Sequence, residues 1–541
     1  MKQKSGEIKV VYGAVVLIFL SFLAAPLFFI LKNAFLGQEG FSLEFFQEII
    51  AGKDFFEMMT NSLSVSILSA ALSTILAFLI AYTLQYTNLH RGVKKVIRGI
   101  TVMPMLLPTI TYGFAIIYSF GKQGLMTKLF GKQLFEIYGK NGLVLGFVIY
   151  TLPVAFTLIY NTMLYIDKKF SVVSKIMGDS VIKNFKNTVL VPMLGTLGAA
   201  FVQSFFLCFT DFGIPASVGG EYKVIASSLY GEMLGSLPNF HTGSVIALLM
   251  LLPSIVSIAV LTWLERYNIR YQKISTIEIR KNRTRDGVFG VISGAVCAAV
   301  LMVFAVIVIV PFVKLWPYEM SFTMEHVIAG LTGSELGSVY KNSLFVAIVT
   351  AICGVVLTYG AALITARSKL SKGMKKIIES ISLITNTVPG MVLGIAYLLM
   401  FTGTSLQNTF LILIICNVIH YFSTPYLMFH NSLAKMNQSW ETTAMLMGDS
   451  WIKTIIRVVT PNAMSTVWEV FAYYFVNAMV TISAVVFLVG ARTAVMTTKI
   501  KELQHFAKFN EIFILSLMIL LTNAAAKIVF EKLANRRSKK K

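Results

Sequence analysis

The chain has 541 residues, of which 56% are hydrophobic and only 13% are charged, so most of it requires an apolar surround. This composition excludes an ordinary soluble domain and predicts a polytopic membrane protein in contact with lipid. The net charge of +22 would suggest nucleic acid in a soluble chain, but here Lys and Arg occupy short loops between apolar runs, as topology signals do. We therefore expect no nucleic-acid partner.

Runs of about 20 apolar residues, the length that a bilayer core requires, occur about a dozen times. Their approximate positions are 10–32, 62–87, 99–120, 143–164, 190–217, 244–264, 288–314, 343–366, 378–402, 409–430, 462–489 and 511–530. The fifth and eleventh runs are richer in polar and aromatic residues than the others. The sequence predicts an all-α protein with about 12 transmembrane helices.

Basic residues set the orientation of these spans. They gather at the start (residues 2–9), in the loop 91–98, at 168–186, in the central linker (266–285) and in the tail (536–541). All five regions fall on one side, which we assign to the cytoplasm together with both termini. Two predicted outer loops are also basic, against this trend, and an acidic partner surface or an anionic substrate would balance them. Their basic residues are Lys122, Lys128, Lys132 and Lys140 in one loop, and Arg492, Lys499, Lys501 and Lys508 in the other.

One segment occurs twice. Residues 177–183 read MGDSVIK and residues 447–453 read MGDSWIK, an offset of 270 residues, which is close to half of the chain. Farther out, Asn61-Ser62-Leu63 matches Asn342-Ser343-Leu344, and Pro108 matches Pro389, at an offset of 281. Such self-similarity is typical of a duplicated architecture. The halves share one orientation, so we predict a parallel repeat with a first half at 1–264, a basic cytoplasmic linker at 265–287 and a second half at 288–541.

Each copy of the repeated segment has the composition of a helix-turn-helix. Gly178 and Gly448 can adopt the left-handed conformation that ends a helix, and the following Asp-Ser can cap the next helix. That next helix is expected to run to a proline, Pro192 or Pro461, before a membrane span. The repeat therefore predicts a pair of loops on one face of the membrane.

The sequence carries no signature of catalysis. No phosphate-binding loop, His-Glu-x-x-His motif, paired-Cys motif or nucleophile elbow occurs, and the six histidines are scattered. The four cysteines lie inside apolar runs, where packing explains them better than metal binding. We expect no metal site and no enzymatic activity.

The repeated loop resembles the EAA loop of binding-protein-dependent ABC importer permeases, which has Glu-Ala-Ala, then three residues and Gly, and a Pro about a dozen positions later. The second copy reads ETTAMLMG over residues 441–448 and reaches Pro461; the first reads SVVSKIMG over 171–178 and reaches Pro192. Gly and Pro are kept in both copies, whereas the acidic residue is kept only in the second. The resemblance covers nearly the whole chain, because each half supplies one permease core, and it implies the type I importer fold.

The resemblance further implies that the two loops, at 165–192 and 432–461, dock onto cytoplasmic ATPase subunits, with the second loop the more sensitive. The residues expected to couple to the ATPases are Met177, Gly178, Asp179, Ser180, Ile182, Lys183, Glu441, Met447, Gly448, Asp449, Ser450, Ile452 and Lys453. The span after each loop lines the pathway in this family. Ionisable groups at membrane depth are costly and tend to face a cavity, so polar residues of these spans are pathway candidates. They are Gln203, Asp211, Gly213, Glu469, Asn477, Thr481 and Ser483.

The stretch TDFGIP at 210–215, followed by Gly219-Gly220-Glu221, is similar to the ferric-iron branch of these permeases, which includes fused chains and phosphonate-type relatives. The implied function is the permease subunit of an ATP-driven importer in the bacterial inner membrane, carrying ferric iron or a small ligand such as a phosphonate. Its partners would be two ATPase subunits, which bind ATP and Mg in place of any cofactor on this chain, and an extracytoplasmic binding protein. The alternative is a secondary transporter of the major facilitator type, which is also built from parallel halves.

Overall fold

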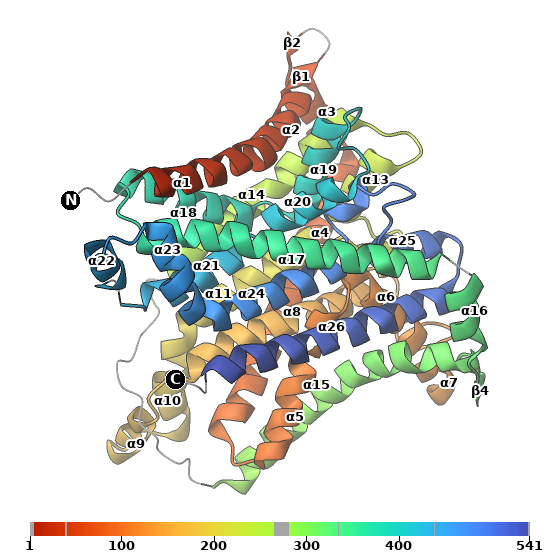
Figure 1. Cartoon of the computed structure of the whole chain (residues 1–541). Helices are drawn as coiled ribbons and strands as arrows, with labels where there is room; N and C mark the ends of the chain where they lie inside the picture. Colours follow the sequence, from red (N-terminus) through yellow and green to blue (C-terminus); the bar gives the residue numbers. More distant parts are fainter. Residues whose placement is uncertain (1–4, 38–39, 265–280, 334, 438, 539–541) are drawn as a thin grey trace. The chain divides into compact units, whose positions relative to one another are not determined.

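The structure, a computed structural model, describes residues 5–37, 40–264, 281–333, 335–437 and 439–538 (Figure 1). The rest of the predicted linker (265–280) and the charged ends at 1–4 and 539–541 lie outside the described residues. The described chain is almost entirely helical and divides into two compact units. Unit 1 comprises residues 1–49, 231–251 and 328–541, and unit 2 comprises residues 50–230 and 252–327.

Unit 2 is formed mainly by the first half of the chain. Its helices are α4 (Lys53–Tyr86), α5 (Arg91–Val102), η2 (Met103–Leu106), α6 (Thr109–Phe120), α7 (Leu125–Phe130), α8 (Lys140–Met163), α9 (Lys169–Ile176), α10 (Val181–Phe185), η3 (Lys186–Leu190), α11 (Val191–Thr210), α12 (Gly213–Val218), α15 (Arg283–Ile309) and η5 (Val310–Phe312). The hairpin of β3 (Val313–Leu315) and β4 (Glu319–Phe322) also belongs to it. The division between the units falls within four helices: α3 (Glu44–Ala51), α13 (Ile225–Leu234), α14 (Phe240–Leu264) and α16 (Glu325–Gly333).

Unit 1 is formed mainly by the second half. Its helices are α1 (Ser5–Phe19), η1 (Leu20–Ala24), α2 (Ala25–Phe35), α17 (Leu336–Arg367), α18 (Lys372–Thr387), α19 (Gly390–Phe401), α20 (Phe410–His420), α21 (Ser423–Ala434), α22 (Ser439–Leu446), α23 (Trp451–Thr454), η6 (Ile455–Val459), α24 (Thr460–Val480), η7 (Val485–Phe487), α25 (Met496–His505) and α26 (Phe509–Ser538). The short hairpin of β1 (Leu36–Gly37) and β2 (Gly40–Phe41) leads to α3 (Glu44–Ala51).

Each unit contains the first span of the other half. In unit 1, α1 packs against α17 and α2 packs against α19, where the Tyr397 hydroxyl donates to the Phe22 carbonyl at 2.6 Å. In unit 2, α15 packs against α4, α5 and α6, and Ser293 hydrogen-bonds Thr83 at 2.7 Å. The compact units thus cut across the boundaries predicted from the repeat. The predicted boundaries, 1–264, 265–287 and 288–541, were drawn from the sequence repeat and not from contacts between helices, and they stay a prediction.

The predicted all-α polytopic fold is confirmed. Among the described residues, eight helices are long and apolar enough to cross a membrane, or up to 11 if each of three bent pairs is one span. These 11 match 11 of the 12 predicted spans. The twelfth, predicted at 462–489, is α24, which is less apolar than the rest because it carries Asn462, Glu469 and Asn477.

Three predicted spans are bent pairs of helices; the tenth, α20 with α21, is bent by 55°, and the other two are bent more sharply. In place of the third, α5 with η2 and α6 with α7 form a pair bent by 113°, and in place of the ninth, α18 and α19 are bent by 101°. The breaks occur at Pro108 and Pro389, the prolines that match between the halves, because a proline disfavours helical backbone in the residue before it. The matched prolines therefore mark a duplicated bend.

The helices after the repeated loops do not stop at their prolines. The first runs through Pro192 from α10 to α11, and the second runs through Pro461 from α23 to α24. In each, a five-residue π-helical turn, η3 or η6, comes one residue before the proline and accommodates the missing N–H donor. Our prediction that the helix would end at the proline is wrong: each loop helix continues into the span.

The duplication extends to hydrogen bonds at the start of the two longest helices. In unit 2, Asn61 of α4 donates to the Lys223 carbonyl at 3.1 Å, and the Ser62 hydroxyl accepts from the Ile225 N–H at 2.8 Å. In unit 1, Asn342 of α17 donates to the Ala494 carbonyl at 3.0 Å, and the Ser343 hydroxyl accepts from the Met496 N–H at 2.8 Å. The matched Asn-Ser pairs thus hold equivalent turns in both halves.

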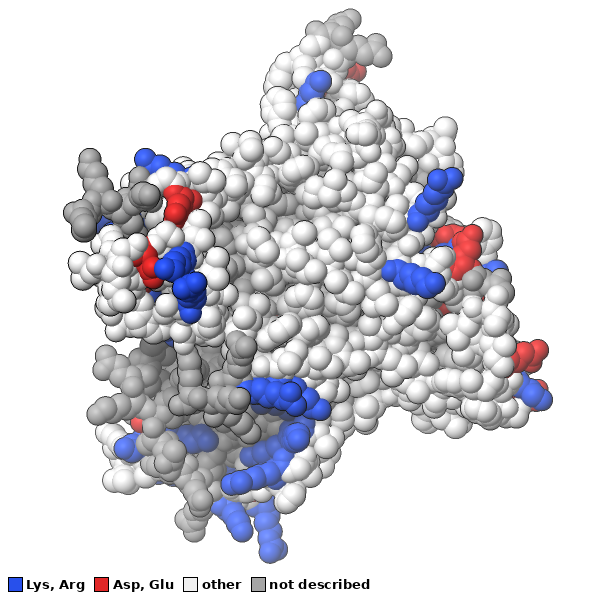
Figure 2. Space-filling view, in the orientation of Figure 1, with Lys and Arg blue, Asp and Glu red and all other residues white. Residues whose placement is uncertain are grey.

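Charged side chains gather at the ends of the helices. Figure 2 shows the Lys, Arg, Asp and Glu side chains in clusters, and a broad stretch of surface that is almost free of charge. Exposed apolar residues, such as Ile75, Ile352 and Val356, are what a lipid-facing surface requires.

Candidate functional site: the paired loops

The two repeated loops have the same backbone. In the first, α9 ends at Gly178, whose φ of +82° is left-handed; the Gly178 N–H donates to the Lys175 carbonyl and the Asp179 N–H to the Ser174 carbonyl, both at 3.1 Å. In the second, Gly448 also has a φ of +82°, and the corresponding bonds measure 3.1 and 2.9 Å. This is the Schellman arrangement, which requires a residue that tolerates positive φ. The sequence predicted both turns.

The Asp-Ser pair then starts the next helix in both loops. Ser180 and Ser450 are the N-caps of α10 and α23, and each hydroxyl accepts from the backbone N–H of the lysine three residues later. The acidic residue pairs with the side chain of that lysine, at 2.7 Å for Asp179 and Lys183. Asp449 and Lys453 form the equivalent ion pair in the second loop. These contacts are the reason for the repeated sequence.

Apolar side chains cover the outside of each turn. In the first loop Ile176, Met177, Val181 and Ile182 are each 77% exposed or more. In the second loop Leu446 and Met447 are similarly exposed, Ile452 is 42% exposed, and Trp451 is buried. Apolar groups clustered on a polar, solvent-facing loop mark an interaction surface.

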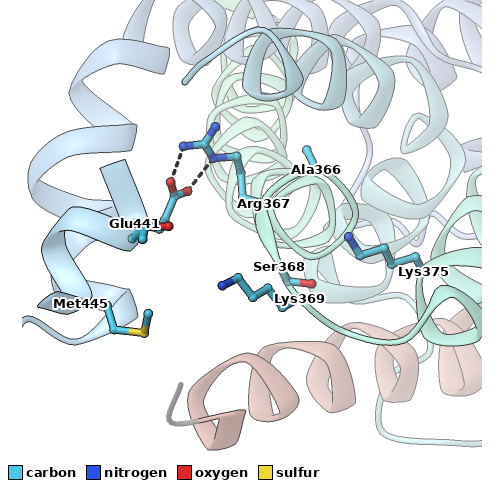
Figure 3. A pocket seen from close by; sticks show the side chains of 8 residues that line it. Ala366, Arg367, Ser368, Lys369, Lys375, Glu441 and Met445 are labelled. Atoms are coloured by element: carbon cyan, nitrogen blue, oxygen red, sulfur yellow. Dashed lines mark hydrogen bonds and ion pairs between the residues drawn. The ribbon is translucent and has the colours of Figure 1, made fainter. Parts of the chain in front are cut away.

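An ion pair that the sequence analysis missed anchors the second loop. Arg367, the last residue of α17, donates through Nε and Nη2 to the two carboxylate oxygens of Glu441, both at 2.6 Å (Figure 3). The Arg367 side chain is fully buried, and it also donates to the carbonyls of Met436 and Asn437 at 2.8 and 2.9 Å. A bidentate, charge-assisted pair of this kind is strong and directional. The signal in the sequence that could have predicted this pair was a basic residue, Arg367, at the end of a predicted span, together with the acidic residue that only the second loop keeps, Glu441.

The Arg367–Glu441 pair forms one wall of a cavity of about 130 Å³. The cavity is lined by Ala366, Arg367, Ser368, Lys369, Lys375, Glu441, Thr442 and Met445. In Figure 3 the Glu441 carboxylate points to the guanidinium of Arg367, while Lys369 and Lys375 lie on the other side of the cavity. Glu441 is therefore satisfied within the chain.

The first loop is held differently. Tyr86 and Ser171 stand at the positions of Arg367 and Glu441 in the repeat. Two hydrogen bonds join Ser171 and Asn184 within the loop. The Ser171 hydroxyl donates to the side-chain oxygen of Asn184 at 2.8 Å, and the Asn184 side-chain amide donates to the Ser171 carbonyl at 2.7 Å. Lys168 reaches α4 by donating to the Gln85 carbonyl at 3.0 Å, and its ammonium lies 5.5 Å from the Tyr86 ring centroid. The first loop is thus braced mainly within itself.

The N-terminal helix contacts the second loop. The Glu7 carboxylate of α1 accepts from the Ile452 N–H at 3.3 Å, in the first turn of α23. A carboxylate at a helix N-terminus is electrostatically favourable. The start of α1 and the second loop therefore lie at the same end of unit 1, as Figure 1 also shows.

The predicted pathway residues occupy mixed surroundings. Asp211, the C-cap of α11, is buried, and its carboxylate accepts from the Ile214 N–H at 2.9 Å and from the Thr109 hydroxyl. Thr481 stands at the same place after α24, where its hydroxyl bonds Tyr421 and its carbonyl accepts from Thr497 at 2.7 Å. Gly213 is buried against Thr109, and a Cβ there would meet Ile110 N at 2.6 Å. For these three residues, local packing accounts for the side chains, and a pathway role stays a prediction.

The remaining candidates lie on the two helices themselves. Gln203 on α11 and Asn477 on α24 are half-buried, and the Asn477 amide donates to the Tyr473 carbonyl at 2.7 Å within its own helix. Glu469 is exposed on α24, and Ser483 is half-buried after it. No group of three or more His, Cys, Asp or Glu side chains that could hold a metal ion occurs within the described ranges.

Comparison with known proteins places this arrangement in a family. Residues 355–539 match the family described as binding-protein-dependent transport system inner membrane component. The match lies in the second half of the chain, which is therefore similar to the proteins of this family. The matched residues include α22, the left-handed turn at Gly448 and α24, so the second loop lies inside the matched region.

Curated relatives extend the similarity beyond this matched region. The chain is 23% identical over 427 residues to the ferric transport system permease protein FbpB of Actinobacillus pleuropneumoniae, covering 74% of this chain and 60% of that one. It is 24% identical over 410 residues to the putative ferric transport system permease protein FbpB 1 of Haemophilus influenzae, covering 73% and 64%. A spermidine/putrescine transport system permease protein PotC homolog of Mycoplasma genitalium matches over 190 residues at 26% identity. The chain thus spans less than two thirds of the length of the two ferric permeases. The predicted resemblance to fused ABC importer permeases is confirmed.

Proposed function

We propose that the chain is the membrane-spanning permease subunit of an ATP-driven importer and works with two cytoplasmic ATPase subunits and an extracytoplasmic binding protein. The observation that carries this proposal is the pair of loops. Both present exposed apolar residues on a left-handed glycine turn, and both continue without interruption into a long helix, α11 or α24. A force applied to either loop would therefore act directly on α11 or α24. In this proposal ATP is hydrolysed by the partners, and this chain gates the pathway.

The proposed substrate is ferric iron. Support comes from the names of two relatives, ferric transport permeases that match about three quarters of this chain. A phosphonate or another small anionic ligand remains the second candidate substrate. The family match disfavours a secondary transporter of the major facilitator type, which would have no use for two ATPase-docking loops.

The decisive experiment purifies the tagged chain after co-expression with the ATPase and binding protein encoded beside it. We expect two ATPase subunits per chain, ATP-dependent uptake of radioactive ferric iron into proteoliposomes and none without the binding protein. Uptake driven by a proton gradient alone, with no ATPase bound, would instead favour a secondary transporter. Replacing ferric iron by a phosphonate in the same vesicles distinguishes the two candidate substrates.

The basic residues of the predicted outer loops now fall into two groups. Lys128 donates to the Pro317 carbonyl, Lys499 pairs with Glu335 and Glu502 at 3.2 and 2.7 Å, Lys501 donates to Gln504 at 3.0 Å, and Lys508 pairs with Glu511 at 3.3 Å. The exposed residues Lys122, Lys132, Lys140 and Arg492 are the better candidates for meeting an acidic binding protein. Their replacement by Glu should slow association with that protein, and more so at low salt.

A further inference from the structure

The helix α17 is long enough to connect the two faces of a membrane. It has 32 residues, from Leu336 to Arg367, which corresponds to roughly 48 Å at 1.5 Å per residue. A bilayer with its headgroup regions measures about 40–45 Å. Figure 1 shows α22 near one end of α17 and α25 near the other, both within unit 1.

The inner end of α17 is fixed to the second loop. Arg367 forms two bonds to Glu441 of α22 and donates to the carbonyls of Met436 and Asn437, which connect α21 to α22. A fifth, longer contact reaches the Leu433 carbonyl at 3.4 Å. One buried guanidinium therefore holds the beginning of the loop from several directions, and the loop cannot move without moving the end of α17.

The outer end of α17 is fixed to the segment that follows the pathway helix, residues 490–496, which we call the outer turn. Asn342 donates to the Arg492 and Ala494 carbonyls at 3.2 and 3.0 Å, and the buried Ser343 hydroxyl accepts from the Met496 N–H at 2.8 Å. One residue on, the Thr497 hydroxyl donates to the carbonyl of Thr481, where α24 ends. The outer turn thus joins the start of α17 to the end of the pathway helix.

Between its ends α17 is packed closely on α24. A Cβ on Gly354 would lie 2.5 Å from the buried Tyr474 ring, so the two helices touch there without a side chain between them. Nearer the loop, the Tyr359 and Thr460 hydroxyls are hydrogen-bonded at 2.8 Å. A helix packed this closely transmits displacement along its axis because protein interiors do not deform continuously.

The corresponding helix of the first half, α4, has the same outer attachment, but its described inner contacts with the loop include no ion pair. Asn61 and Ser62 hold the turn before α13 as Asn342 and Ser343 hold the outer turn. At the inner end Tyr86 replaces Arg367. The first loop meets α4 through the Lys168 bond to the Gln85 carbonyl, the contact of Lys168 with the Tyr86 ring, and the Phe185 ring, which packs on Phe78 and Tyr82. Among the described contacts, an ion pair therefore joins the loop to the long helix in the second half and not in the first.

We propose that α17 carries movement of the second loop to the outer turn, with Arg367 as the positioning residue that connects the loop to the helix. This deepens the proposed function and rests on it, since the movement is supplied by a docked ATPase. The route is additional to the direct one, in which α23 continues into α24. It gives the second loop two routes, whereas the first loop acts through the direct one, from α10 into α11.

The test uses the complete transporter in proteoliposomes with Arg367→Gln, which keeps a long polar side chain but removes the charge. We expect ATPase binding and ATP hydrolysis to persist while substrate transported per ATP falls at least fivefold. Lys375→Gln is the matched control, because it removes a charge from the same cavity without touching Glu441. Arg367→Lys should restore part of the coupling, since an ammonium can still meet the carboxylate but not as a fork.

A second variant distinguishes lost coupling from a local folding defect caused by the change at Arg367. Asn342→Ala changes the other end of α17 and should also lower the amount of substrate transported per ATP. The double variant of Arg367→Gln with Asn342→Ala should lower it little further than the stronger single variant. Asn61→Ala, the matching change in the first half, should lower it less. A fluorophore at Arg492→Cys, in a background lacking the native cysteines, should report movement on nucleotide addition in the parent and not in Arg367→Gln. Unchanged coupling and an unchanged fluorophore response in Arg367→Gln would overturn the proposal. Absence of transport in the parent protein would instead overturn the proposed function.

Discussion

The two repeated loops have the same backbone but different anchors. Both have a glycine at a φ of +82°, the same pair of turn hydrogen bonds and the same serine cap. The second is attached to a long helix by a buried Arg–Glu pair, while the first is braced by Ser171 and Asn184 within itself. Duplication thus preserved the shape that a partner would recognise, and the attachment to the membrane helices diverged. The comparison teaches that two loops with one backbone can be attached to their neighbouring helices by different contacts.

The largest effect is expected from removing one side of the buried pair. Glu441→Ala leaves the Arg367 guanidinium buried without its counter-charge, which should cost about 3–5 kcal/mol in the free energy of unfolding of unit 1. The double variant Arg367→Met with Glu441→Leu should recover most of this stability, because a well-packed apolar pair avoids the desolvation cost. Thermal unfolding in detergent measures both. Equal stability of Glu441→Ala and the parent would mean that the pair is not formed.

The glycine turns give the next largest effect. Gly178→Val and Gly448→Val each force a β-branched residue into left-handed backbone, at a cost of about 1–2 kcal/mol. Open space surrounds both Cβ positions, so the cost comes from the backbone and not from a clash. Stimulated ATPase activity and transport should fall while the chain still inserts, and more for Gly448→Val. Gly→Asn at the same positions is the control, because Asn tolerates this conformation. Full transport by the double Val variant would contradict the docking role.

A smaller effect should isolate the brace of the first loop. Asn184→Ala removes the two bonds to Ser171 and should weaken the first loop by about 1–2 kcal/mol. Amide hydrogen exchange should rise in α9 and α10 and stay unchanged in α22, whose anchor is elsewhere. Thr454→Ala, at the equivalent position of the second loop, is the matched comparison. Faster exchange in both loops after Asn184→Ala would show that the loops are not held independently.

The comparison extends to the acidic residues of the two helices that are predicted to line the pathway, α11 and α24. Cysteine in place of Asp211 should be protected from a polar thiol reagent in the nucleotide-free state, because the position is 5% exposed, whereas cysteine in place of Glu469 should react. If Asp211 lines the pathway, as the sequence predicts, nucleotide addition should raise its reactivity. Protection in every state would assign the carboxylate to capping α12 alone.

The smallest effect concerns pH. Hydrogen bonds from Lys183 and Ser174 lower the pKa of Asp179 below its ordinary value of 3.8. The carboxylate therefore stabilises the first loop above that ordinary pKa, and the contribution is lost as the pH falls through the lowered one. Between pH 8 and 5 hydrogen exchange in this loop, corrected for the intrinsic rate, should be constant. A change within that range would point to a different titrating group.

Sequence patterns predicted what is local and repeated. The glycine turns, the serine caps and the apolar spans all follow from residue type and spacing within one segment, and the 270-residue repeat paired the loops. The bends at Pro108 and Pro389 were visible as a matched pair, but apolar length alone favoured straight spans. The passage of the loop helices through Pro192 and Pro461 required π turns, which leave no clear signature in residue type.

Contacts between distant segments could not be predicted in the same way. Arg367 and Glu441 are 74 positions apart, and the first half offers no matching pair from which to infer their contact. The Asn-Ser pairs were detected as a repeat, yet only the structure shows that they hold the turns before α13 and α25. Asp211 was predicted to have a function because it is an acidic residue within a predicted span. Its hydrogen bond to the first turn of α12 could not be predicted, because it depends on how the chain turns after α11.

The exchange of first spans between the units has a consequence for how the protein is made. The helices α1 and α2 leave the ribosome before their partners α17 and α19, which follow roughly 300 residues later, a delay of about 15–60 s at 5–20 residues per second. During that time the first span can meet only the earlier parts of unit 1, such as His241 of α14, which bonds the Asn33 carbonyl at 2.8 Å, while α4, α8 and α11 can already pack against one another. Unit 2 can therefore mature before unit 1, and the first two helices need a holding site in the membrane or at the insertion machinery until synthesis ends.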